Sequence, residues 1–157
     1  MAAARKVEID CAGSFADAAA LVVGVRAGEV FERAGGVLDT SDVERVHDMR
    51  VATRRLRAAL EVFAPAFPRK RHRKALKRVR GLADALGERR DLDVEIELLE
   101  SMAPAVAGPD RAALEGLIEE LRERQAAAND VLAPYVRPKR LKKLQRRLRK
   151  LVKEVKR

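Results

Sequence analysis

The chain has 157 residues, and its 34 Lys and Arg against 24 Asp and Glu give a net charge of +10 at pH 7. With 47% hydrophobic residues, a chain of this length can hide roughly 70% of its unfolded surface, so we expect one globular domain over residues 1–157. The single cysteine, Cys11, excludes a disulfide scaffold within the chain. No apolar run approaches the roughly 18 residues of a membrane span, and no secretory segment is evident, so we expect a cytoplasmic protein without membrane contact.

The composition favours an all-α fold. Ala, Leu, Arg and Glu are abundant, whereas the sequence has one Tyr, no Trp and only 3% aromatic residues. Apolar spacing and Gly or Pro positions predict an antiparallel bundle of about six helices. A flexible N-terminus is predicted at 1–13. The predicted helices cover approximately residues 14–34, 41–63, 69–86, 91–101, 110–133 and 139–156.

Several predicted helix ends depend on individual capping residues. Ser14 with Asp17 indicates an N-cap and its reciprocal acid at the start of the first helix. Ser41 with Glu44 predicts a capping box at the start of the second. Gly87 is expected to be the C-cap that ends the third helix, which separates it from a short acidic fourth helix.

Charge is segregated along the chain. Residues 64–90 hold ten basic and two acidic residues, and residues 137–157 hold twelve basic and one. Between these basic blocks, residues 91–136 hold eleven acidic and three basic residues. This segregation indicates an anionic partner, an internal pairing of the acidic block with a basic one, or both.

The second predicted helix carries a core-facing stripe on one side and a cationic ridge on the other. At about 100° per residue, its apolar residues share one arc of about 140°. That stripe comprises Val46, Met49, Ala52, Thr53, Leu56, Ala59, Leu60 and Phe63. His47, Arg50, Arg54 and Arg57 follow one another at helical spacing on the opposite side. Like charges so arranged repel, so we expect acids or a polyanion to offset them.

The third and sixth predicted helices are also basic and amphipathic. In the third, Arg73, Lys77 and Arg80 lie opposite an apolar arc that contains His72. We interpret His72 as a core residue. In the sixth, a narrow leucine and valine stripe is surrounded by cations that we interpret chiefly as a solvated face.

Residues 46–57, VHDMRVATRRLR, resemble the signature helix of the CHAD family, the histidine α-helical domains that bind inorganic polyphosphate. A second family element is similar to residues 82–94, LADALGERRDLDV. The resemblance implies an all-helical fold whose two similar halves pack about a pseudo-twofold axis and line a basic channel. Here the likeness is to the first half only, because no second HxxRxxxRRLR pattern follows residue 100 and no fused triphosphate-tunnel domain is found.

The resemblance, together with the helical spacing, implies a polyphosphate-binding surface. The residues assigned to it are His47, Arg50, Arg54, Arg57, Arg73, Lys77, Arg80 and Arg90. For Arg90 an alternative stays open, in which it pairs with Asp91 or Asp93 to fix a loop. Since half of the family's domain is missing, the options are an open basic face or a homodimer that restores the twofold arrangement. We favour the homodimer because pairing would bury an exposed apolar face.

Other function classes are less well supported. The sequence has no P-loop, no nucleophile with an evident base and no Cys/His metal framework, so we expect a protein that is not an enzyme and that uses no cofactor or metal. The acids Asp91, Asp93, Glu95 and Glu97 alternate and would point to different sides of a helix. Nucleic-acid binding is the main alternative, because the isoelectric point is about 10.3. Few aromatic residues are available for stacking, however, which leaves backbone binding through the sixth helix.

The biological role of polyphosphate binding also stays open at this point. The sequence is compatible with simple binding, with location at polyphosphate granules and with regulation of a separate phosphate enzyme. It also does not predict which length of polyphosphate chain is preferred.

Overall fold

The computed structural model describes residues 3–155, which form five α-helices, two short 3₁₀ helices and no strand. The elements are α1 (Phe15–Glu32), α2 (Val43–Val62), η1 (Ala64–Ala66), α3 (Arg69–Met102), η2 (Ala103–Ala105), α4 (Gly108–Val136) and α5 (Pro138–Lys153). The predicted all-α fold is therefore confirmed. Residues 1–2, part of the N-terminal segment predicted to be flexible, lie outside the described range, as do residue 156, the end of the sixth predicted helix, and residue 157.

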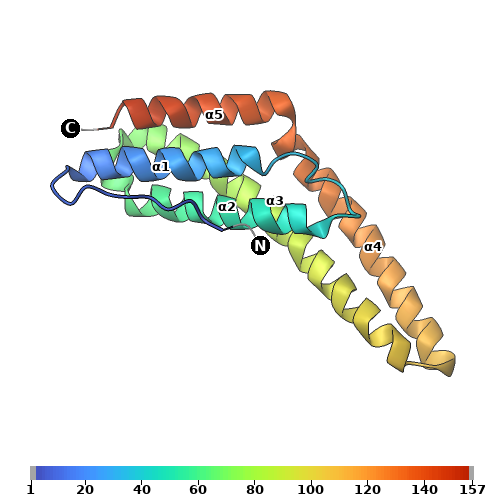
Figure 1. Cartoon of the computed structure of the whole chain (residues 1–157). Coiled ribbons are helices and arrows are strands. Elements are labelled where there is room, and N and C mark those ends of the chain that lie inside the picture. Colours follow the sequence, from blue (N-terminus) through green and yellow to red (C-terminus); the bar gives the residue numbers. More distant parts are fainter. Residues whose placement is uncertain (1–2, 156–157) are drawn as a thin grey trace.

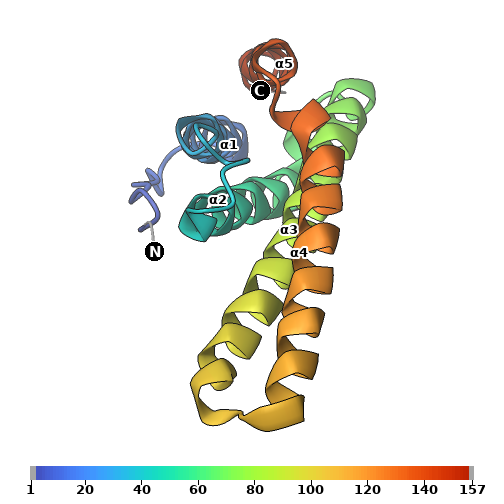
Figure 2. The ribbon, with the colours of Figure 1, turned by 90° about the vertical axis from the view of Figure 1, so that its right-hand side faces the viewer.

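The helices form a packed body from which a helical hairpin projects. In Figure 1, the axes of α1, α2 and α5 are roughly parallel, with α1 running opposite to α2 and α5, and α3 crosses them obliquely. The second half of α3 and most of α4 extend beyond this body side by side, as both views show (Figures 1 and 2). A small apolar cluster of Leu92, Ile96, Leu121 and Ala128 joins the two arms of the hairpin. The acidic block of the sequence therefore lies largely on a projection.

Helix α3 is continuous over 34 residues, so the prediction that Gly87 ends a helix was wrong. A glycine inside a helix costs about 1 kcal/mol relative to alanine, which tertiary packing can offset. Here Leu86 packs in the core of the body and Leu92 packs in the hairpin. Just after Gly87, Arg89 forms a buried ion pair with Asp93, four residues further along the same helix. Contacts on both sides of Gly87 thus keep the helix intact.

Two of the helix ends differ in how well the sequence predicted them. The N-cap of α1 is confirmed, because Ser14 Oγ accepts a hydrogen bond from the Asp17 backbone N–H at 3.0 Å. The capping box at Ser41 was wrong. Ser41 donates its hydroxyl to Asp39 Oδ1 at 2.7 Å instead, and α2 has Asp42 as an N-cap without a side-chain hydrogen bond. Because the Ser41 hydroxyl forms its hydrogen bond within this local turn, it does not cap the start of α2.

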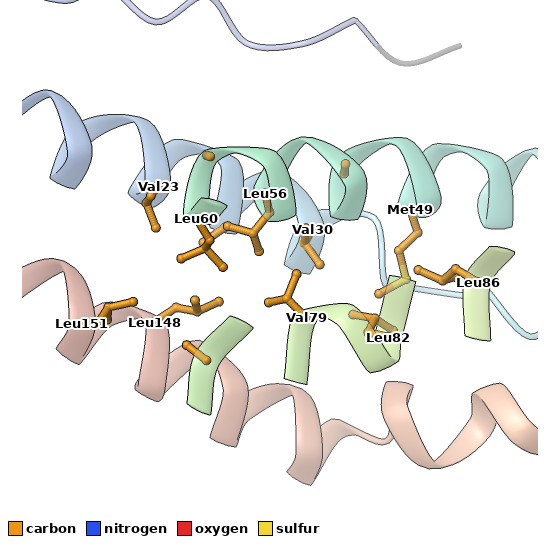
Figure 3. Close-up of a cluster of buried hydrophobic side chains, with 14 of the residues drawn as sticks. Val23, Val30, Met49, Leu56, Leu60, Val79, Leu82, Leu86, Leu148 and Leu151 are labelled. Carbon is orange, nitrogen blue, oxygen red and sulfur yellow. The ribbon is translucent and has the colours of Figure 1, made fainter. Parts of the chain in front are cut away.

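The core of the body is formed by α1, α2, α3 and α5. Figure 3 shows side chains from these four helices pointing toward one another, among them Val30, Leu56, Val79 and Leu148. The predicted stripe of α2 is buried from Val46 to Leu60, while Phe63 at its end is half-buried. Burying each Val, Met or Leu side chain of this stripe contributes roughly 1.5–3 kcal/mol. Because this stripe faces the core, the opposite side of α2 is left for other contacts.

His72 is a core residue, as predicted. It is 8% exposed, and its Nε2 atom lies 2.7 Å from the Leu60 carbonyl oxygen. Its ring also stacks on Phe67 with a centroid separation of 6.0 Å. The hydrogen bond satisfies a buried polar group and ties the start of α3 to the end of α2.

The N-terminal segment, from residue 3 to 13, has no helix and is fastened to α1 near Arg5. The Arg5 backbone N–H donates to Glu29 Oε1 at 2.7 Å, and its guanidinium bonds Glu32 at 2.6 Å. Burial, the largest single influence, raises the pKa of Glu29, but the hydrogen bonds from Arg5 and Arg26 together bring that pKa below its ordinary value. The flexibility expected of this segment stays a prediction.

Candidate polyanion-binding surface

Three arginines of α2 line a pocket between α2 and α3. Arg50, Arg54 and Arg57 follow i, i+4 and i+7 spacing, so they leave the helix on one side. The pocket has a volume of about 400 Å³. Arg54 is exposed, whereas Arg50 and Arg57 are half-buried. The structure therefore brings these three predicted site residues together on the face opposite the core.

Basic residues of α3 continue this row beyond the pocket. Glu61 Oε1 accepts hydrogen bonds from Arg57 Nε at 3.1 Å and from Arg80 Nη2 at 2.8 Å, which places Arg80 next to the end of α2. Lys77 and Arg73 lie one and two turns before Arg80 on the same face of α3, and both are exposed. We call six of these residues the cationic track: Arg50, Arg54, Arg57, Arg73, Lys77 and Arg80.

Most of the cationic track carries charge that the protein itself does not neutralise. Within residues 3–155, Arg50, Arg54, Arg73 and Lys77 form no ion pair. Only Arg57 and Arg80 do so, and they share the single carboxylate of Glu61. Hydrogen bonds from Arg80 and then Arg57 lower the pKa of Glu61, so it stays ionised throughout the neutral range. The track thus has a surplus of positive charge.

Acidic residues of α3 line the other wall of the pocket. Asp84, Glu88 and Asp91 are exposed there, yet the described residues include no ion pair between them and Arg50 or Arg54. These acids were not among the residues predicted from the sequence to lie at the site. Asp84 lies four residues after Arg80, so extending the α3 row by one turn would have found it. The track is consequently most positive toward its Arg73 end.

The remaining two predicted site residues lie differently. His47 is half-buried one turn before Arg50, on the same side of α2. Arg90 turns away from the pocket, with 14% of its side chain exposed, and lies 3.9 Å from Glu44 and 3.8 Å from Glu97. The alternative in which Arg90 fixes a loop is wrong, because α3 is continuous there. Arg90 therefore lies near carboxylates of both α2 and α3, and its assignment to ligand binding stays a prediction.

The acidic block forms its ion pairs mainly within the hairpin. Arg122 of α4 bonds Glu100 of α3 at 2.6 Å, and Arg111 bonds Glu115 at 2.7 Å. In α5, by contrast, the basic residues make no ion pair with any residue described. Internal pairing of a basic block with the acidic block does occur, between Arg89 and Asp93 and between Arg90 and Glu97, but within residues 3–155 it leaves most of the cations in the two basic blocks without an ion pair.

Metal binding and membrane crossing find no support in the described range. Residues 3–155 contain no group of three or more His, Cys, Asp or Glu side chains placed to hold a metal ion. Asp93, one of the acids considered for such a role, is instead buried against Arg89 and Gln125. None of the helices in this range combines the length and apolarity that spanning a bilayer requires.

Fold and surface together define a small all-helical domain with a cationic track along α2 and α3, most of whose residues form no ion pair within residues 3–155. Residues 26–157 match the family model described as the CHAD domain, and the chain belongs to that family. CHAD domains are associated with polyphosphate binding. The match confirms the resemblance first seen at residues 46–57 and 82–94. Comparison with curated proteins and with solved structures gave no match.

Proposed function

We propose that this protein binds inorganic polyphosphate non-catalytically along the cationic track. The observation that carries the proposal is that the structure aligns arginines from α2 with cations from α3 and leaves most of them without an ion pair in the described residues. Polyphosphate offers repeated negative charges and no base edges. It therefore requires positioned cations and hydrogen-bond donors rather than a shaped pocket.

Arginine suits this ligand because its planar fork donates two parallel hydrogen bonds to phosphate oxygens. Along α2, the rise of about 1.5 Å per residue spaces Arg50 and Arg57 by about 10 Å, and Arg73 and Arg80 are equally spaced along α3. An extended anion can thus contact cations of one helix and then those of the next. His47, one turn beyond Arg50, is suited to the end of this path.

Homodimer formation is part of the proposal. Val94, Leu98 and Met102 are exposed at i, i+4 and i+8 on the projecting half of α3, so they form one apolar line. Pairing of two chains through such a line would remove apolar surface from water. A twofold dimer would also present two cationic tracks to one ligand.

Titration of the protein with medium-chain polyphosphate and with a DNA duplex at about 0.15 M salt tests the proposal. We expect polyphosphate to bind at least about tenfold more tightly than DNA. Light scattering at each point should give about twice the chain mass of 17.4 kDa. Equal or tighter DNA binding would instead support the nucleic-acid alternative, and a mass of one chain would reject the dimer.

Glu61→Gln is expected to strengthen polyphosphate binding about threefold at pH 7. A charge about 6 Å from a phosphate in a water-like dielectric contributes about 0.7 kcal/mol, which corresponds to that factor. Because the pKa of Glu61 lies below its ordinary value, the gain should be constant between about pH 6 and pH 8. It should vanish in acid, where wild-type Glu61 is protonated.

Glu115→Gln is the matched control for that measurement. Glu115 also pairs with an arginine four residues away, Arg111, but it lies on the hairpin. Its replacement should leave polyphosphate affinity unchanged within about 1.5-fold. An unchanged affinity in Glu61→Gln would show that the ligand does not lie near the junction of Arg57 and Arg80.

A further inference from the structure

A second basic pocket lies between α3, the end of α4 and α5. Its volume is about 430 Å³, within the range of pockets that hold small ligands. It is separate from the cationic track because Arg78, which lines it, and Arg80, which belongs to the track, point about 160° apart around α3. No residue of the cationic track lines this second pocket.

Four cations surround the pocket: Arg78 of α3 and Arg140, Lys143 and Arg147 of α5. They come from different helices yet converge on one volume. No acidic residue lines it, and none of the four forms an ion pair with any residue in the range 3–155. Arg147 is half-buried, and the other three are exposed. The pocket therefore carries about four uncompensated positive charges, which suits several phosphate groups rather than one.

An aromatic side chain forms part of the wall, and the sequence makes room for it. Tyr135, near the end of α4, lies against α3 at Gly81. A Cβ at residue 81 would lie 3.0 Å from Tyr135 Cε1 and 3.1 Å from its hydroxyl oxygen. The glycine thus permits the ring to sit where it does. Tyr135 remains 37% exposed, so part of it is available to a ligand.

The lining of this pocket differs in kind from that of the pocket on the cationic track. Besides Tyr135, the α5 pocket has Leu82, Pro134 and Leu144 in its wall. The track pocket has only Ala83 and Gly87 beside its charged residues. An inorganic phosphate chain gains nothing from apolar and aromatic surface. A ligand with both a flat ring and phosphates would contact the apolar and aromatic part of the lining with its ring and the cationic part with its phosphates.

We propose that the pocket formed by α3, α4 and α5 binds a nucleoside di- or triphosphate. Its base packs on Tyr135 and the neighbouring apolar wall, and its phosphates are held by Arg78, Arg140, Lys143 and Arg147. No covalent step is involved. This site is independent of polyphosphate binding on α2.

Calorimetric titration with ATP and with inorganic triphosphate, which have similar charge, tests the role of the ring. Stacking of a base on an aromatic side chain is worth about 1–3 kcal/mol. ATP should therefore bind at least about tenfold more tightly than triphosphate. Tyr135→Ala should bring the ATP affinity to within about threefold of that for triphosphate, whose own affinity should not change. Equal affinities for the two ligands in the wild-type protein would overturn the proposal.

A pair of charge variants on α5 tests the position of the phosphates. Lys143→Gln combined with Arg147→Gln should weaken ATP at least about tenfold. Arg146→Gln combined with Arg149→Gln removes the same charge from the same helix outside the pocket and should weaken ATP less than about threefold. An equal loss in both double variants would mean general electrostatic attraction and would overturn the site.

One further variant distinguishes nucleotide binding in this pocket from polyphosphate binding on the cationic track. The Arg50→Ala, Arg54→Ala variant should keep its ATP affinity within about twofold, because neither residue lines the α5 pocket. If ATP binding is lost in that variant and kept in Lys143→Gln, Arg147→Gln, ATP occupies the cationic track. That result would reject the nucleotide pocket while leaving polyphosphate binding on α2 intact.

Discussion

Replacing Arg50 and Arg54 together with alanine is expected to weaken polyphosphate binding about 30-fold at about 0.15 M salt. A hydrogen bond to a charged group contributes about 1.5–3 kcal/mol, and solvent at this open pocket reduces that to about 1 kcal/mol for each arginine. The slope of affinity against salt concentration should fall as well, because two fewer cations displace counterions. Fluorescence or calorimetric titration at several salt concentrations measures both effects.

The matched control is Arg146→Ala combined with Arg149→Ala, which removes the same charge from α5. Its polyphosphate affinity should fall less than about threefold. Within residues 3–155, Arg50 and Arg54 form no ion pair, so their loss should leave the unfolding temperature nearly unchanged. Equal weakening by the two double variants would contradict a defined track and would indicate binding by net charge alone.

Asp93→Ala is expected to destabilise the protein by about 3–5 kcal/mol because it leaves Arg89 as an uncompensated buried charge. Both side chains are 0% exposed, and Arg89 Nη1 bonds Asp93 Oδ2 at 2.5 Å. Gln125 Nε2 of α4 donates to the other carboxylate oxygen at 2.6 Å. This group joins α3 to α4 at the base of the hairpin. Urea unfolding followed by circular dichroism measures the loss, which corresponds to a fall of roughly 10 °C in unfolding temperature.

Replacing both partners should behave differently from replacing one. Burial raises the pKa of Asp93 and lowers that of Arg89, so the ionised pair costs folding free energy relative to a neutral group. Arg89→Met combined with Asp93→Leu should therefore recover most or all of the wild-type stability. Glu100→Ala, which breaks an exposed pair with Arg122, should cost less than about 1 kcal/mol. A loss of that size in Asp93→Ala would contradict this account of the pair.

The raised pKa of Asp93 also determines whether its contribution to folding stability rises or falls with pH. A carboxyl whose folded pKa lies above its unfolded value binds its proton more tightly when folded. Its contribution is therefore most favourable below the unfolded pKa and declines as the pH rises through the folded pKa. Glu61 has the opposite sign, since its pKa is lowered: its contribution is present at neutral pH and is lost as the pH falls.

Helix α2 was predictable because one sequence pattern specifies both of its faces. Its apolar residues recur at helical spacing and are buried, so the arginines between them must lie on the other side. The ranges of α1 and α5 and the core position of His72 followed in the same way. These predictions needed only local spacing and the preference of apolar groups for the interior.

Features that depend on contacts between distant segments were harder to predict. The continuity of α3 through Gly87 relies on α4, which supplies Gln125 to the buried pair. From their i, i+4 spacing alone, Arg89 and Asp93 would be predicted to form an exposed ion pair. In the structure α4 covers them, and both side chains are buried. Similarly, the packing of Tyr135 against Gly81, which is far away in the sequence, is visible only in the fold. Spacing within one helix contains no information on such neighbours.

Backbone amide NMR during a polyphosphate titration shows whether polyphosphate lies along α2 and the first half of α3. Shift changes should concentrate at residues 47–61 of α2 and 73–88 of α3, and those on α5 should be small. Changes confined to residues 138–153 would contradict this position and would place the polyanion on the basic C-terminal helix instead.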